Sequence, residues 1–199
     1  MKEYKLVIID DNMPLGVKEP FARIIAKMNA DADVSVFTDP SGGFRFIMNN
    51  LQSKMIVFLD CKFDEDDLQG IDVLRKIRER TSLVYVVMMS VNSLNGFSKE
   101  VLYEFINEEF ISFYDRNKEP NSVTEIINKV KRLWTSRFDC VLENWIHRHP
   151  EDREKVVMHQ HNESFTWDRI LTELHQQTEV GKSFERMVHQ FYIYQLPEK

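Results

Sequence analysis

The sequence predicts an α/β protein: a doubly wound, five-stranded parallel sheet followed by a small, mostly helical C-terminal domain. In the first two-thirds of the 199 residues, short apolar runs alternate with segments whose apolar residues recur at helical spacing. The runs are apolar at every position, as in parallel strands that are buried on both faces. The last third contains mainly helical patterns, which indicates a second, different domain.

Composition limits the class of protein. Apolar residues make up 43% of the chain and charged residues 29%, which is typical of a globular protein. A net charge of -6 argues against a nucleic-acid or anionic-membrane partner. The two cysteines lie far apart, and there is no signal-peptide pattern and no run of 18 apolar residues. We therefore expect a cytoplasmic protein without a membrane segment.

The expected strands are the apolar runs at residues 6–9, 34–37, 55–59, 83–89 and 110–114. The expected helices that follow them cover residues 15–29, 43–52, 71–80, 98–107 and a segment that begins near 122. Right-handed crossovers between parallel strands make such a sheet doubly wound. Ligands bind to these sheets in the crevice beyond the carboxyl ends of the strands. Candidate functional residues are therefore those that follow each strand.

Polar residues follow four of the five expected strands. Asp10 and Asp11 follow the first, Asp60 the third, Ser90 the fourth and Arg116 the fifth. Three crowded carboxylates repel one another unless a cation lies among them. Mg²⁺ prefers such oxygen ligands, together with waters and a phosphate oxygen. The pattern thus favours a magnesium site, with helix capping as the alternative role for the two adjacent aspartates.

These residues, in this order and spacing, resemble the receiver domain of two-component response regulators. The matching segments are IIDDN at 8–12, FLD at 58–60, GIDVLRKIRE at 70–79, the strand-end serine at 90 and FYDR at 113–116. The resemblance covers about residues 1–135 and implies a flavodoxin-like receiver fold. Residues 136–199 then form the separate helical output or interaction domain.

The resemblance implies a role for each acidic residue. Asp60 would accept a phosphoryl group from a histidine kinase or a histidine phosphotransferase. Mg²⁺ would be held by Asp10, Asp11, Asp60 and the backbone carbonyl of Lys62. A receiver promotes only its own phosphorylation, so we do not expect an enzyme that turns over a substrate.

The resemblance also implies the residues that respond to phosphorylation. Ser90 would bind the phosphoryl oxygens, and Phe113 would be the aromatic residue whose rotamer follows the switch. Arg116 stands where the family usually has a lysine, and Arg and Lys are not equivalent. Lys118 is an alternative counterpart.

The segment after Asp60 departs from the family pattern. The usual Met-Pro is absent, and CKFDEDDLQG, about two residues longer, stands in its place. We interpret the acidic residues 64–67 in it as a solvated loop instead of a second metal site. Cys61 is expected to be buried and inert.

The last third predicts a helical interaction module. A helical pattern runs to about residue 147, either unbroken or interrupted near Ser136. Thr166 is expected to cap a further helix, Gly181 to interrupt the pattern and Ser183 to cap the last helix, although FYIYQL also suits a strand. All six histidines lie here, but their spacing does not favour zinc.

The partner of this module is expected to be a protein, either of unidentified type or a second copy of the chain. Residues 140–199 contain 7 Lys or Arg and 10 Asp or Glu, a net charge of -3. DNA binding needs clustered cations, so a DNA-binding transcription regulator is the less favoured alternative. A phosphate-independent scaffold remains open. A Mg²⁺-dependent phosphatase is disfavoured because Asn12 and Lys62 occupy the positions where a general acid would stand.

Overall fold

The chain divides into two compact units, Met1–Lys131 and Arg132–Lys199, each described here by itself. The computed structural model describes residues 2–13, 20–64, 68–91, 97–117, 121–160 and 162–195. None of the helices in these ranges is long and apolar enough to cross a bilayer.

The first unit is built on one parallel sheet. Its strands are β1 (Tyr4–Ile9), β2 (Ala32–Phe37), β3 (Met55–Asp60), β4 (Tyr85–Ser90) and β5 (Ile111–Asp115). They are hydrogen-bonded in the order β2-β1-β3-β4-β5, and every neighbouring pair is parallel. The predicted doubly wound, five-stranded sheet is therefore confirmed. The chain winds outward from β1 to β2 and then returns to β3, so the switch point lies between β1 and β3.

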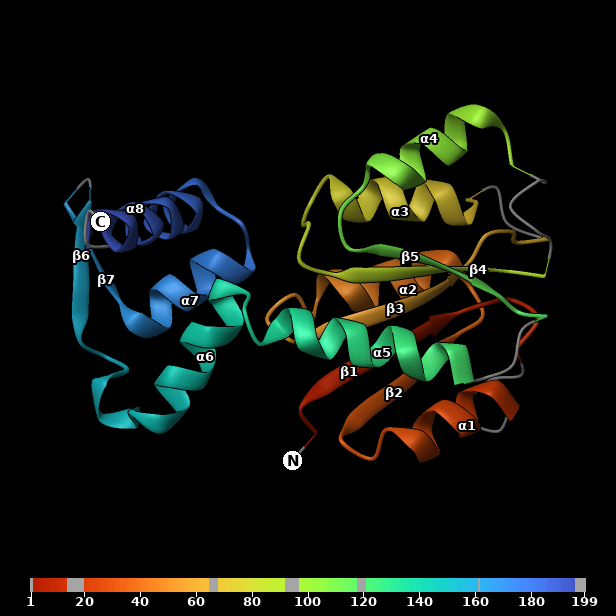
Figure 1. Cartoon of the computed structure of the whole chain (residues 1–199), viewed down its shortest axis with the longest axis horizontal. Helices are drawn as coiled ribbons and strands as arrows, with labels where there is room; N and C mark the ends of the chain where they lie inside the picture. Colours follow the sequence, from red (N-terminus) through yellow and green to blue (C-terminus); the bar gives the residue numbers. More distant parts are fainter. Residues whose placement is uncertain are drawn as a thin grey trace. The chain divides into compact units, whose positions relative to one another are not determined.

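Helices cover both faces of this sheet. They are α1 (Pro20–Met28), α2 (Pro40–Met48), α3 (Gly70–Arg78), α4 (Lys99–Asn107) and α5 (Asn121–Trp134). In Figure 1, α1 and α5 lie on one side of the sheet, and α3 and α4 lie on the other. Every residue of β3 and of β4 is buried, which explains why these strands are apolar on both faces.

Local sequence explains where α2 begins. The side chain of Asp39 accepts a hydrogen bond from the backbone N–H of Gly42, and Pro40 occupies the first turn. A capping aspartate followed by proline is a favoured helix start, so α2 begins three residues before the predicted range. The predicted helix at 15–29 is seen as α1 from Pro20, and residues 14–19 lie outside the described part of the chain.

The second unit has its own core. Its elements are α6 (Phe138–Arg148), a 3₁₀ turn (Pro150–Asp152), β6 (Val156–Gln160), β7 (Glu163–Thr166), α7 (Trp167–His175) and α8 (Glu179–Gln195). Six buried side chains form the centre of this core: Leu142, Ile146, Phe165, Ile170, Leu174 and Phe184. Because α5 ends at Trp134 and α6 begins at Phe138, the helical pattern is interrupted near Ser136, which was one of the two alternatives.

Two expectations for this unit need correction. Strands β6 and β7 form an antiparallel hairpin that the sequence patterns did not predict; Asn162, with φ of 64°, lies between them. Gly181 does not interrupt the last helix, because α8 continues through it to Gln195. A Cβ at Gly181 would lie 2.5 Å from the carbonyl oxygen of Glu173, so glycine permits close approach to α7. The predicted cap at Thr166 is confirmed, since its side chain accepts a hydrogen bond from the Arg169 N–H.

A buried ion pair fixes the start of α6. Arg137 donates from Nε and Nη2 to the two carboxylate oxygens of Asp139, over 2.7 and 2.8 Å. Asp139 is only 4% exposed, so an unpaired charge here would be costly.

We predict that Asp139→Ala lowers the free energy of unfolding by about 3 kcal/mol, because it removes the carboxylate that pairs with the buried Arg137 guanidinium. Urea denaturation followed by the fluorescence of Trp145 and Trp167 measures this loss. The matched control is Asp168→Asn in the exposed pair with Arg153, which should cost less than about 1 kcal/mol. Equal losses in the two variants would contradict the prediction.

Candidate metal centre

Three carboxylates meet where β1 and β3 end. Asp10 and Asp11 directly follow β1, and Asp60 is the last residue of β3. Because these strands are neighbours at the switch point, their carboxyl ends lie at the same edge of the sheet. One oxygen from each carboxylate lies within 4.8 Å of the others. The structure thus brings together the three aspartates that the sequence had singled out.

The carboxylates of Asp10 and Asp11 are held by loop groups. Asp10 is fully buried; its Oδ1 accepts from the backbone N–H of Asn12 over 2.9 Å, and its Oδ2 accepts from Arg116 Nη1 over 2.5 Å. Asp11 accepts from the Asp64 N–H over 2.7 Å and from the Asn12 side chain over 3.0 Å. The sequence alone did not identify Asn12 and the Asp64 amide as groups that orient the two carboxylates. The position of Asn12, directly after the two aspartates, could have indicated its role.

Asp60 is buried and lies close to other charged side chains. Its residue is 8% exposed, and its Oδ2 lies 3.7 Å from Arg116 Nη1. Burial, and then the charge of Asp10, raise the pKa of Asp60 to about 6, although Arg116 and the backbone N–H groups of Lys62 and Cys61 act in the opposite direction. Burial also raises the pKa of Asp10, against the effect of Arg116. Ionising both groups is therefore unfavourable without further positive charge.

Ser90 ends one strand, and Arg116 directly follows its neighbour. Ser90 ends β4 and is 6% exposed, and its carbonyl oxygen accepts from the Arg116 N–H over 2.9 Å. This bond holds the start of the loop after β5, from which the guanidinium reaches the aspartates. Lys118 lies outside the described residues. Among the described ones, Arg116 places its guanidinium beside Asp10 and Asp60.

The remaining predicted residues lie at the edges of the site. Phe113 is in β5, with its ring 6.0 Å from that of Phe97 in a T-shaped contact. Lys62 is an exposed residue of the loop after β3, two positions beyond Asp60. Cys61 is buried, and burial followed by the charge of Asp60 raises the pKa of its thiol to about 12. In the acidic segment, Asp64 is described and residues 65–67 are not.

The donor set suits a divalent cation. Three carboxylates carry a formal charge of -3, and among the described residues the guanidinium of Arg116 compensates only part of it. Hard carboxylate oxygens are the ligands that Mg²⁺ prefers. Burial, and then the charge of Asp10, raise the pKa of Asp60, so a bound cation would favour its ionised form. These residues therefore fit Mg²⁺, and Asp10, Asp11 and Asp60 would be its ligands.

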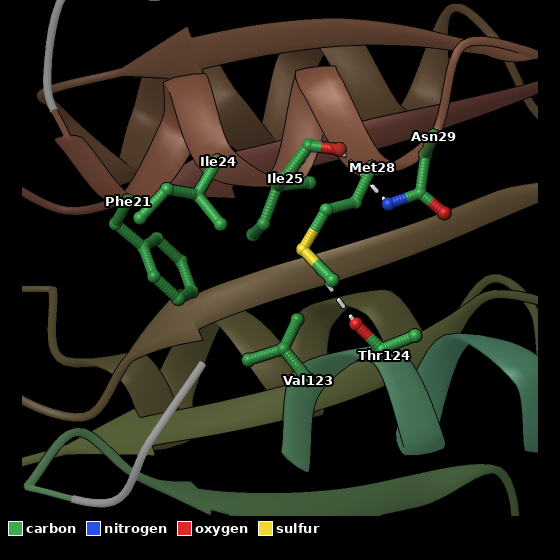
Figure 2. A pocket seen from close by; sticks show the side chains of 7 residues that line it. All are labelled: Phe21, Ile24, Ile25, Met28, Asn29, Val123 and Thr124. Atoms are coloured by element: carbon green, nitrogen blue, oxygen red, sulfur yellow. Dashed lines mark hydrogen bonds between the residues drawn. The ribbon is translucent and has the colours of Figure 1, made fainter. Parts of the chain in front are cut away.

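The described residues of the first unit line a polar hollow beside the cluster and an apolar one elsewhere. A cavity of about 520 Å³ adjoins the cluster and is lined by Asp11, Asn12, Thr38, Asp39, Pro40, Phe63 and Asp64. The other lies between α1 and α5; its mainly apolar walls include Phe21, Ile24 and Val123 (Figure 2). The lining of the first includes the carboxylates of Asp11, Asp39 and Asp64, whereas the lining of the second contains no ionisable side chain.

Comparisons with known proteins indicate the fold. No protein-family model matches the chain, and no similar sequence is found among curated proteins. The N-terminal domain of an uncharacterized protein (WS1339) from Wolinella succinogenes is 18% identical, with a TM-score of 0.52 over 65% of this chain and 95% of that one. The first unit, with its strand order, has the flavodoxin-like fold of receivers.

Receiver domains are among the other structural neighbours. The chemotaxis protein CheY4 of Vibrio cholerae is 11% identical, with a TM-score of 0.49 over 64% of this chain and 98% of that one. The receiver domain of NtrX from Brucella abortus is 18% identical, with a TM-score of 0.48 over 63% and 96%. At such low identities the activity has to be argued from this chain's own side chains.

We predict that Asp60→Asn stabilises the metal-free protein at neutral pH. The folded-state pKa of Asp60, about 6, lies above the ordinary 3.8, so its contribution to stability is present below pH 4 and lost as the pH rises through 6. The variant should therefore gain about 2 kcal/mol at pH 7.5 and little at pH 4. Scanning calorimetry at both pH values measures the difference; a gain of the same size at both would contradict this cause.

We also predict that Arg116→Gln raises the pKa of Asp60 above its value of about 6, by about one pH unit, because a nearby positive charge favours the ionised carboxylate. Carbon-13 NMR titration of the aspartate carboxyl groups measures the change. Arg75→Gln is the control, since Arg75 pairs with Glu104 on α4 and should leave this titration where it is. A titration of Asp60 that does not move in Arg116→Gln would argue against the contact.

Proposed function

We propose that this protein is a response regulator whose first unit is phosphorylated on Asp60 with the help of Mg²⁺. One observation carries the proposal: the buried carboxylate of Asp60 lies among the carboxylate oxygens of Asp10 and Asp11, beside the guanidinium of Arg116. This cluster stands at the switch point of a receiver-type sheet, where such folds bind ligands.

The chemistry is transfer of a phosphoryl group to a carboxylate. A carboxylate oxygen of Asp60 forms a bond to phosphorus while the bond from phosphorus to the donor's histidine nitrogen breaks, giving an acyl phosphate. Bound Mg²⁺ would neutralise negative charge on the phosphoryl oxygens. With a pKa of about 6, Asp60 is mainly ionised at pH 7.5 and able to attack. Asp10 and Asp11 hold the cation, and Arg116 and Ser90 lie on adjacent strand ends.

Phosphorylation would then change the interactions of these neighbours. An acyl phosphate adds negative charge and acceptor oxygens to the strand ends. The Arg116 guanidinium and the Ser90 hydroxyl supply a cation and a hydrogen-bond donor for them. Phe113, on the same strand that leads to Arg116, would transmit the change by repacking. The donor in this proposal is a histidine kinase or a histidine phosphotransferase, in the cytoplasm.

For the second unit we propose signalling by protein contact, with domains at 1–135 and 136–199. Four consecutive residues near the end of α8 are 60–85% exposed: Phe191, Tyr192, Ile193 and Tyr194. Exposed apolar clusters of this kind are typical of protein-interaction sites. The partner is an unidentified protein or a second copy of this chain. Salt-dependent retention of the full chain on duplex DNA would instead favour a transcription regulator.

We predict that incubation with Mg²⁺ and acetyl phosphate adds the mass of one phosphoryl group to the protein, measured by intact-mass spectrometry. Asp60→Ala should show no gain, because the accepting oxygen is missing. The matched control is Asp33→Asn, an exposed aspartate on β2 that should leave phosphorylation unchanged.

The other outcomes would select other functions. No gain in mass with varied donors and metals would favour the phosphate-independent scaffold. Release of free phosphate over many cycles would point to a phosphatase.

A further inference from the structure

The loop that follows Asp60 connects α3 to the acidic cluster. It begins with Cys61 and contains Lys62, whose carbonyl is a candidate ligand, and Asp64, whose N–H holds Asp11. This is also where the sequence lacks the Met-Pro of the receiver pattern.

Gln69, the residue before α3, holds this loop with both ends of its amide group. Its Nε2 donates to the carbonyl oxygen of Phe63 over 2.9 Å, and its Oε1 accepts from the N–H of Phe63 over 3.1 Å. One side chain thus satisfies both backbone groups of one residue. Phe63 itself is 4% exposed, so its ring anchors the same point in the core.

Gln69 is in turn fixed to α3. Its backbone N–H donates to Asp72 Oδ2 over 3.2 Å within the first turn of the helix. The next residue, Gly70, lies against the start of the loop: a Cβ there would be 2.1 Å from the carbonyl oxygen of Asp60. The beginning of α3 therefore contacts the loop at Asp60 and again at Phe63.

The contacts continue from Phe63 to the cluster. The N–H of the following residue, Asp64, donates over 2.7 Å to Asp11 Oδ2. With Phe63 fixed on both backbone groups, the direction of this N–H is fixed as well. A continuous path of hydrogen bonds thus leads from the Gln69 amide through Phe63 and Asp64 to the carboxylate of Asp11.

We propose that Gln69 is a positioning residue for the cation: it holds the loop after Asp60 so that the Asp64 amide directs Asp11 toward Asp10 and Asp60. The inference rests on the proposed function for the metal site. Groups that orient a ligand from outside the coordination sphere typically change metal affinity by about 10- to 100-fold. Gln69 acts through the backbone and does not itself reach the carboxylates in the contacts described.

The test is the affinity of the full chain for Mg²⁺, measured by calorimetry at pH 7.5. Gln69→Met keeps the length of the side chain and removes the two hydrogen bonds to Phe63, so it should weaken binding about tenfold. Gln69→Ala is a second variant with the same expected result. The matched control is Asp72→Ala, which removes the carboxylate that accepts from the Gln69 N–H at the start of α3 and should bind Mg²⁺ within about twofold of the unaltered protein.

Hydrogen exchange of the Asp64 amide in the metal-free protein gives a second measurement. This amide should exchange faster in Gln69→Met than in Asp72→Ala, because only the former releases the loop. Unchanged Mg²⁺ affinity in Gln69→Met, or an equal loss in Asp72→Ala, would overturn the inference and leave the metal site standing. Failure of the unaltered protein to bind Mg²⁺ would overturn the proposed metal site and with it the role of Gln69, whatever the exchange rates.

Discussion

The first unit depends on one electrostatic constraint: carboxylates lie at the ends of buried strands, where little water reaches them. Burial makes the ionised form of each carboxylate unfavourable unless other groups compensate its charge. Asp10 is fully buried and Asp60 nearly so, since β1 and β3 are covered on both faces. Their ionised forms are kept by hydrogen bonds from backbone amides and by the guanidinium of Arg116. That compensation is incomplete, and the remaining deficit of positive charge makes the edge of the sheet a favourable place for a cation.

The sheet and the acidic cluster could be read from the sequence because burial on both faces leaves an unambiguous pattern. A strand such as residues 55–59 has no polar position, and the first polar residue after it has to lie at the edge of the sheet. Convergence of Asp10 and Asp60 then follows from the parallel topology alone. The contact between Arg116 and Asp10 could not be inferred in this way, because it depends on the path of the loop after β5.

The features that escaped sequence reasoning depend on contacts between distant residues. By intrinsic propensity, Gly181 resembles a helix terminator. In the structure α7 approaches α8 closely at this position, and α8 fits because glycine has no side chain. The β6–β7 hairpin is short, and its exposed outer positions blur the alternation that would have marked it. The hold of Gln69 on Phe63 joins a side-chain amide to backbone groups six residues earlier, and no periodic pattern records such a bond.

The burial of the two thiols affects how the protein reacts with oxidants and how it can be labelled. Cys61 and Cys140 are 6% and 1% exposed. Burial, and then the charge of Asp60, raise the pKa of the Cys61 thiol to about 12, so this thiol stays protonated at neutral pH. Since the thiolate is the reactive form, peroxide and alkylating reagents find little to attack at Cys61 while the fold is intact. A cysteine introduced on the surface would therefore react faster than the two native cysteines. A spectroscopic label could then be attached to it with little labelling of Cys61 and Cys140.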